Sequence, residues 1–259
     1  MKILKLSDTI GEYFPQGTRR LDYESGVDGV QDWALLLPGK NSHLWIIVIH
    51  GHGAAGDQLY THRDTRERSL PVFLKSGGGI LTINLRGNSW MGPAAAVDMH
   101  ALVGFLRVKY GMRKSIFCSG SMGGTCNLIY GALYPEDVSG IIARGAASDP
   151  ATYFQWCRQR GKPILREIAA AIKNSYGGTP SDTPETYRKH SALLNADKLV
   201  MPVFLSHGGA DTIIPVEQSR TLADKMKHNK NFSYHEITGG NHDSPLYETG
   251  NFDRLLQII

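Results

Sequence analysis

The stretch KSIFCSGSMGGTCNLIYGALY, residues 114–134, decides the expected fold. Its first part, 114–121, is a short apolar run of strand length that ends in a glycine-rich turn. Its second part, 122–134, has helical character and stops at Pro135, a residue that a helix interior does not tolerate. A strand that turns directly into a helix is a building block of α/β folds.

The same unit recurs on both sides of this stretch. Further short, β-rich apolar runs end in polar or glycine-rich turns at residues 44–50, 79–86, 139–148, 202–211 and 231–238. A continuous run such as LWIIVIH, 44–50, is typical of a strand that helices cover on both faces. Helices are predicted at about 94–109, after 211 to about 227, and at about 247–259. We therefore expect an α/β fold with a mostly parallel sheet.

Two regions depart from this rhythm. Before residue 40, TRRLDYESG and VQDWALLLP predict an antiparallel hairpin or meander at the edge of the sheet. Residues 149–200 contain no clear strand and one good helix, Pro163 to about Ser175, that glycines end. Because this length exceeds an ordinary loop, we expect a helical cap insertion at 149–200 within a single domain spanning 1–259.

Composition excludes several classes of protein. The 259 residues are 41% hydrophobic, with a net charge of only +4. The basic residues are dispersed and follow no nucleic-acid-binding motif, so no nucleic-acid partner is expected. Apolar runs such as 44–49 are far shorter than the roughly 20 residues that span a bilayer, so no membrane span is expected either.

The N-terminus and the cysteines bear on location. The first residues, MKILKLSDTIGEYF, carry charges every few positions and lack the apolar core of a secretory signal. Cys118, Cys126 and Cys157 have no metal-ligand spacing and predict reduced thiols in a cytoplasmic protein. The alternative, a signal peptide that has been removed, stays open.

A candidate nucleophile lies in CSGSMGG, residues 118–124. The pattern is Gly-x-Ser-x-Gly with Ser119 in place of the first glycine and Ser121 at the centre. In this motif the central serine sits on a strained strand-to-helix turn that exposes its Oγ, and the flanking positions must be small. The alternative is a glycine-rich helix start that binds an anion.

A serine nucleophile needs a base and a group that orients the base. After Ser121 the chain supplies Asp211, at the end of one predicted strand, and His242, after the next. This is the order Ser, acid, His that the motif requires. Asp149 and Asp243 are rival acids.

The other histidines have different expected roles. His207 and His235 lie within predicted strands and should point into packing. Surface positions are expected for His43, His62, His100, His190 and His228.

An oxyanion needs two backbone N–H donors. Met122, which follows the nucleophile, and His52, in the loop HGHG after the strand 44–50, are the candidates. The alternative is a metal site of His50, His52 and Asp57, although the sequence offers no supporting ligand cluster and no metal is expected.

Together these motifs resemble the α/β-hydrolase superfamily, from about Gln31 to Ile259. The greatest similarity is to serine esterases related to dienelactone hydrolase and to the prolyl-oligopeptidase catalytic domain. The resemblance rests on HGHGAAG (50–56), LRGNSW (85–90), CSGSMGG (118–124), HGGADTIIPVEQS (207–219) and GGNHDSP (239–245). It implies an eight-stranded, mostly parallel sheet, no cofactor, a Ser121–Asp211–His242 triad, and an oxyanion hole of the His52 and Met122 amides. Ser119 is a mild departure from the pattern.

The expected function is hydrolysis of small-molecule carboxylic esters through an acyl-enzyme. No β-propeller precedes the hydrolase part, which favours an esterase over an oligopeptidase. Asn88, Trp90, Tyr153 and Trp156 are candidate substrate contacts, with burial in the core as the alternative for the aromatic residues. A peptidase or amidase of the prolyl-oligopeptidase type and a non-catalytic ligand-binding homologue stay open, and the sequence does not reveal the oligomeric state.

Overall fold

Ile46 and Ile47 are neighbours in the chain, and both are fully buried, on opposite faces of one sheet. They belong to strand β4 (Asn41–Ile49), which runs through the middle of that sheet. Helices cover both faces, so the buried part of such a strand carries apolar side chains on both faces. This is the physical origin of the unbroken apolar runs in the sequence.

The sheet has nine strands in the described residues of this computed structural model, which are 1–9, 11–248 and 250–259. Their order across the sheet is β1-β2-β3-β5-β4-β6-β7-β8-β9, and from β5 to β9 all neighbours run parallel. The strands other than β4 are β1 (Lys2–Asp8), β2 (Arg19–Glu24), β3 (Gln31–Leu37), β5 (Gly78–Ile83), β6 (Lys114–Gly120), β7 (Gly140–Arg144), β8 (Val203–Gly208) and β9 (Phe232–Ile237). The expected α/β fold with a mostly parallel sheet is confirmed.

The expected number of eight strands is one too few. The first 40 residues form three antiparallel strands, β1 to β3, and β3 joins the parallel part through an antiparallel pairing with β5. β1 is the extra strand. It lies at the edge, it is mostly exposed, and its sequence KILKLSD carries lysines. An exposed edge strand does not require a continuous apolar run, so the pattern that identified the buried strands missed it.

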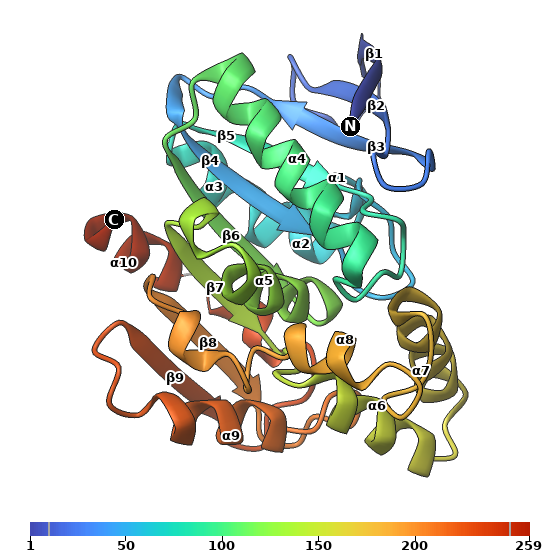
Figure 1. Ribbon diagram of the computed structural model, residues 1–259. Helices are drawn as coiled ribbons and strands as arrows, with labels where there is room; N and C mark the ends of the chain where they lie inside the picture. Colours follow the sequence, from blue (N-terminus) through green and yellow to red (C-terminus); the bar gives the residue numbers. More distant parts are fainter. Residues whose placement is uncertain (10, 249) are drawn as a thin grey trace.

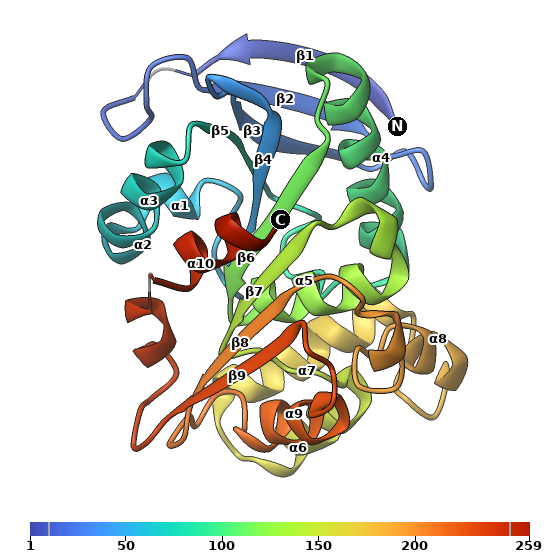
Figure 2. The ribbon, with the colours of Figure 1, turned by 90° about the vertical axis from the view of Figure 1, so that its left-hand side faces the viewer.

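Two sets of helices cover the sheet, as Figure 2 shows. Buried side chains of α4 (Pro93–Tyr110), α5 (Met122–Leu133) and α9 (Glu217–Met226) pack into the core on one face. On the other face lie α1 (Gln58–Thr61), α2 (Arg63–Arg68), α3 (Leu70–Lys75) and α10 (Gly250–Ile258). No helix in the described residues is long and apolar enough to cross a bilayer.

Residues 149–200 form α6 (Pro150–Gln159), α7 (Pro163–Tyr176) and α8 (Pro184–Lys189), and no strand of the described chain lies there. Only α7 was expected. α6 begins at Pro150, with Asp149 Oδ1 accepting a hydrogen bond from the Ala151 N–H, a cap signal that the sequence carries. Figure 1 shows these helices gathered at one end of the sheet.

Short 3₁₀ turns complete the chain at Pro135–Asp137, Ala196–Lys198 and Ser244–Tyr247. The helix expected from about residue 247 begins only at Gly250, after the last of these turns. The loops after β4, β6, β8 and β9 contain His52, Ser121, Asp211 and His242 respectively. All four leave the carboxyl edge of the parallel strands, where ligands bind in open α/β sheets.

Candidate active site

Ser121 occupies the turn between β6 and α5, with φ 56° and ψ −128°. Positive φ is strained for a residue with a side chain, and such strain gathers at functional sites. The Ser121 N–H donates to the Arg144 carbonyl at 2.8 Å, which ties the turn to β7. A Cβ on Gly123 would lie 2.1 Å from the Ile49 carbonyl oxygen, so glycine is required two residues after Ser121.

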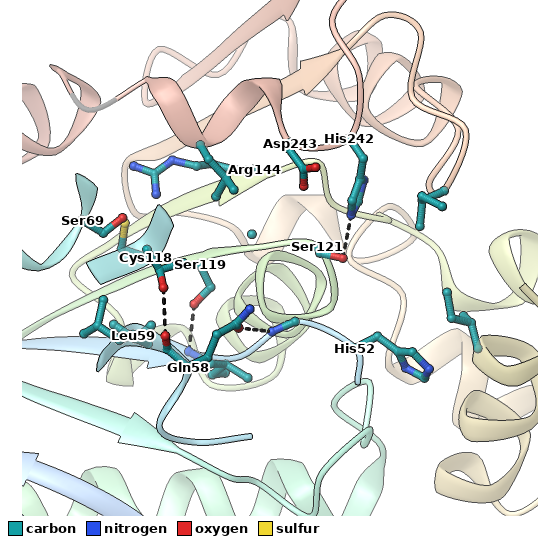
Figure 3. A pocket seen from close by; sticks show the side chains of 18 of the residues that line it. His52, Gln58, Leu59, Ser69, Cys118, Ser119, Ser121, Arg144, His242 and Asp243 are labelled. Carbon is teal, nitrogen blue, oxygen red and sulfur yellow. Dashed lines mark hydrogen bonds between the residues drawn. The ribbon is translucent and has the colours of Figure 1, made fainter. Parts of the chain in front are cut away.

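Ser119, the departure from the motif, has a structural task. The regular pairing of β4 with β6 ends at Ile47 and Phe117. Beyond it, the Ile49 N–H donates to Ser119 Oγ at 2.9 Å, inside the core. The hydroxyl therefore continues the hydrogen bonding between the two strands after their backbones have diverged (Figure 3).

Restoring the motif glycine is therefore expected to destabilise the protein. In Ser119→Gly the buried Ile49 N–H loses its acceptor, which costs about 1–3 kcal/mol of unfolding free energy. Urea denaturation measures the difference, with Ser181→Gly at an exposed turn as the control, expected to change by less than about 0.5 kcal/mol. A Ser119→Gly variant as stable as the wild type would show that this bond contributes nothing.

Ser121, His242 and Asp211 form one hydrogen-bonded chain. His242 Nε2 lies 2.9 Å from Ser121 Oγ, and its Nδ1 lies 2.6 Å from Asp211 Oδ2. Because the carboxylate can only accept, Nδ1 carries the proton and Nε2 is free to accept from the serine hydroxyl. Figure 3 shows His242 pointing at Ser121.

Asp211 is hydrogen-bonded to several groups besides His242. Its Oδ1 accepts hydrogen bonds from the Ile213 and Ile214 N–H groups at 2.7 and 3.0 Å. His207 Nε2 lies 3.2 Å from its Oδ2. Burial raises the pKa of Asp211, but the hydrogen bonds from His207, His242 and the Ile213 N–H outweigh burial and hold that pKa well below its ordinary value. The carboxylate is therefore ionised at neutral pH.

The two rival acids, Asp149 and Asp243, have different surroundings from Asp211. Asp149 caps α6 through the Ala151 N–H, and burial raises the pKa of its carboxyl group. Asp243 is exposed at the side of the cavity. Neither forms a hydrogen bond with His242 among the described residues.

Other histidines differ from expectation. His235 was expected to be packed, but it is exposed and contacts Glu248, because β9 is the other edge strand. His190 was expected at the surface, but it is buried and hydrogen-bonded to the Met91 carbonyl. His207 is buried, as expected.

The loop after β4 presents one unused backbone donor. The Gly51 N–H donates to Gln58 Oε1 at 2.7 Å, and the Gly53 N–H donates to Asn88 Oδ1 at 2.8 Å. Between them, the His52 N–H has no acceptor in the described residues, and neither has the Met122 N–H at the start of α5. These are the two donors that the sequence selected.

The side chains of both histidines in this loop are hydrogen-bonded within the protein. The two ring nitrogens of His50 lie 2.7 and 2.9 Å from the Gly51 and Asn84 carbonyl oxygens. His52 Nδ1 accepts from Trp90 Nε1 at 3.2 Å. No group of three or more potential metal ligands occurs among the described residues.

The four candidate substrate contacts lie behind the site rather than in its cavity, since none of them lines it. Asn88 holds the Gly53 N–H, and Trp90 is buried against the His52 and Tyr153 rings. The Tyr153 hydroxyl donates to the Ile213 carbonyl, and Trp156 stacks on Tyr153. These side chains support the loops that carry His52 and Asp211.

A cavity of about 310 Å³ opens beside Ser121 and His242. One wall is apolar and comes from Ile164 and Ile168 of α7 and from Ile213. The other is formed by α1 to α3 and the ends of β4, β6 and β7, with Gln58, Leu59, Thr65, Ser69, Phe73, Cys118 and Arg144 among its residues (Figure 3).

Known structures share this arrangement of strands and helices. An esterase of Pyrococcus furiosus, Pf2001, superimposes with a TM-score of 0.69 over 96% of this chain and 95% of its own, at 16% identity. A dipeptidyl aminopeptidase IV described as putative, from Bacteroides ovatus, gives a TM-score of 0.71 at 15% identity, over 93% of this chain and 35% of its own. This is the α/β-hydrolase fold.

Part of this chain is also similar to known sequences. Residues 152–257 match the prolyl oligopeptidase family. The uncharacterized peptidase YtmA of Bacillus subtilis is 23% identical over 107 residues, which are 41% of this chain and 38% of YtmA. Both matches are partial, and the family match contains Asp211 and His242 but not Ser121.

Sequence reasoning missed parts of this hydrolase-fold site. The walls formed by α1 to α3 come from short helices without a clear apolar period. Arg144 was also missed. The sequence did carry a signal for it, because Arg144 is the single charged residue in the run SGIIARGAAS, 139–148.

Proposed function

We propose that the protein is a serine hydrolase that cleaves carboxylic esters through an acyl-enzyme intermediate. One observation carries the proposal: the hydrogen-bonded chain from Ser121 through His242 to Asp211 lies at a cavity, with two unused N–H donors, of His52 and Met122, beside it. This is the combination of nucleophile, base, orienting acid and oxyanion hole that acyl transfer requires.

In the first half-reaction, His242 Nε2 accepts the Ser121 proton while Oγ attacks the ester carbonyl carbon. The carbonyl oxygen becomes an oxyanion, which the His52 and Met122 amides stabilise. His242 then gives its proton to the departing alcohol oxygen, the C–O bond breaks, and Ser121 is left acylated. Asp211 keeps the imidazole in the required tautomer and stabilises its charged form.

The second half-reaction reverses the roles. Water attacks the acyl carbon and gives a proton to His242 Nε2, and the same amides hold the oxyanion. The carboxylic acid leaves as His242 returns the proton to Ser121 Oγ. Atoms and charges therefore balance with this chain's own groups and water alone.

Ester cleavage is supported by the esterase Pf2001, which shares this fold over 96% of this chain. We also propose that residues 149–200 act as a cap that shapes the substrate site, supported by Ile164 and Ile168 of α7 in the cavity wall. The free, buried cysteines support a cytoplasmic location.

A peptidase or amidase is the second candidate, supported by the match of residues 152–257 to the prolyl oligopeptidase family. It would use the same groups, with an amine in place of the alcohol.

The two candidates separate on substrates that share one acyl group. We expect kcat/KM for 4-nitrophenyl esters of short acids to exceed that for the matching 4-nitroanilides by at least about 10³-fold, the equivalent of about 4 kcal/mol. Release of the chromophore measures both. Anilides or peptides cleaved as fast as the esters would assign a peptidase instead.

A further inference from the structure

The cavity beside Ser121 contains a buried cation without an acidic partner. Arg144, the last residue of β7, is only 5% exposed and lines the cavity. Its Nη2 donates to the Glu248 carbonyl at 3.2 Å. Its Nε has no hydrogen-bond partner, and no carboxylate of the described residues lies within 4.0 Å of the guanidinium.

The position of Arg144 connects it with the proposed reaction. Its carbonyl accepts the Ser121 N–H at 2.8 Å, so its backbone adjoins the nucleophile turn. Its strand partner in β6 is Gly120, two residues after Cys118, so the Arg144 side chain lies on the Cys118 face of the sheet. In Figure 3 the side chain extends toward Ser69 and Cys118, away from His242. Arg144 thus lies at the opposite side of the cavity from α7.

An unpaired buried charge is costly. A buried guanidinium normally has a carboxylate and a full set of hydrogen bonds, because it has given up its hydration. A charge held without a partner at a cavity is explained when a ligand supplies the missing anion.

We propose that Arg144 binds a carboxylate of the substrate, so that the preferred substrates are esters carrying a second, ionised carboxyl group. The inference rests on the proposed ester hydrolysis and specifies its substrate class. A planar guanidinium binds a carboxylate through two N–H donors, which also fixes the position of the scissile bond relative to Ser121.

The charges around the cavity favour a carboxylate over a phosphate. Arg144 is the single Lys or Arg among the described residues that line it. His52 adds no positive charge, because burial lowers the pKa of its imidazole more than the nearby Glu167 raises it. Asp243, also in the lining, is negative. One buried cation matches a monoanion, whereas a phosphate monoester carries nearly two charges.

Matched pairs of substrates test the inference. One series sets the mono-4-nitrophenyl esters of six- to eight-carbon dicarboxylic acids against the 4-nitrophenyl esters of fatty acids of equal length. A second series places the carboxylate on the alcohol side, with its methyl ester as the neutral partner. In one of the series, we expect the wild-type kcat/KM for the anionic member to exceed that for the neutral member by about 10–100-fold. This ratio corresponds to the free energy of one charge-assisted hydrogen bond.

Variants then assign that preference to one side chain. Arg144→Met should remove the preference by lowering kcat/KM for the anionic esters more than for the neutral ones, and Arg144→Lys should keep part of it. Arg158→Met, which removes an exposed charge from α6, should change neither. Arg144→Lys still reports on the charge if Arg144→Met fails to fold.

Three results would overturn the inference. One is an absence of preference for the anionic member in both series, and another is an equal loss of both members in Arg144→Met. The third, no turnover of any ester by the wild type, would overturn the proposed function and this inference with it. Hydrolysis of the neutral esters alone would leave the function intact and refute only the role of Arg144.

Discussion

Replacing Ser121 with alanine is expected to lower kcat for ester hydrolysis by about 10⁴–10⁶-fold. The change removes the Oγ atom that forms the acyl-enzyme. It leaves the His52 and Met122 amides, which account for the residual rate over water. Stability should change little, because Ser121 Oγ makes its side-chain bond to His242 at the edge of the cavity. Turnover of 4-nitrophenyl esters and thermal unfolding measure the two effects.

Ser119 provides the matched control for this experiment. It lies two residues earlier in the same motif and binds the Ile49 N–H in the core. Ser119→Ala should lose stability but retain more than about a tenth of the wild-type kcat. Wild-type-like turnover in Ser121→Ala, with loss in Ser119→Ala, would move the nucleophile to Ser119 and refute the account.

The second large effect is expected for Asp211→Asn, with kcat lowered by about 10⁴-fold. Asparagine keeps an acceptor for the Ile213 and Ile214 N–H groups, but its NH₂ then faces His242 Nδ1. That donor favours the tautomer with the proton on Nε2, which cannot accept from Ser121. Asp149→Asn, in the α6 cap, is the control and should change kcat by less than about 10-fold. A larger loss in Asp149→Asn than in Asp211→Asn would reassign the acid.

Asp211 also makes the stability of the protein depend on pH. Its pKa is lower in the folded state, so the ionised carboxylate stabilises the fold above its ordinary pKa near 3.8. This contribution is lost as the pH falls further through the folded-state value. The wild type should therefore exceed Asp211→Asn in unfolding free energy at pH 7, by a margin that shrinks below about pH 4. Urea denaturation at several pH values checks this, and a margin that grows on acidification would contradict it.

Ser121 and Asp211 could be selected from the sequence because each follows a buried strand, and His242 because it follows the next strand along the chain; parallel strands end at one edge. The buried strands themselves were visible because both of their faces must be apolar. β1, by contrast, escaped detection because an exposed edge strand has no such requirement. Side-chain surroundings were harder to predict, since they depend on tertiary packing. His190 is buried because α8 packs near the Met91 loop, and His235 is exposed because it lies on an edge strand.

The residues that line the cavity were also hard to predict from the sequence. Trp90 was a candidate substrate contact, but it lies behind His52, in a loop where its own φ is 47°. Arg144 was readable as a charge in an apolar run, yet only the structure reveals that its guanidinium is buried beside Ser121 without a carboxylate. Local sequence patterns predicted which loops come together. The side chains that line the cavity could be identified only from the folded structure.

The central claim is that Ser121 Oγ is the nucleophile, and the most direct measurement is the site of a covalent adduct. The wild-type protein is treated with a fluorophosphonate, and its peptides are analysed by mass spectrometry. The account predicts one adduct, on Ser121, that forms much more slowly in Asp211→Asn and is absent in Ser121→Ala. An adduct on another residue, or no adduct on a folded protein that hydrolyses esters, would contradict it.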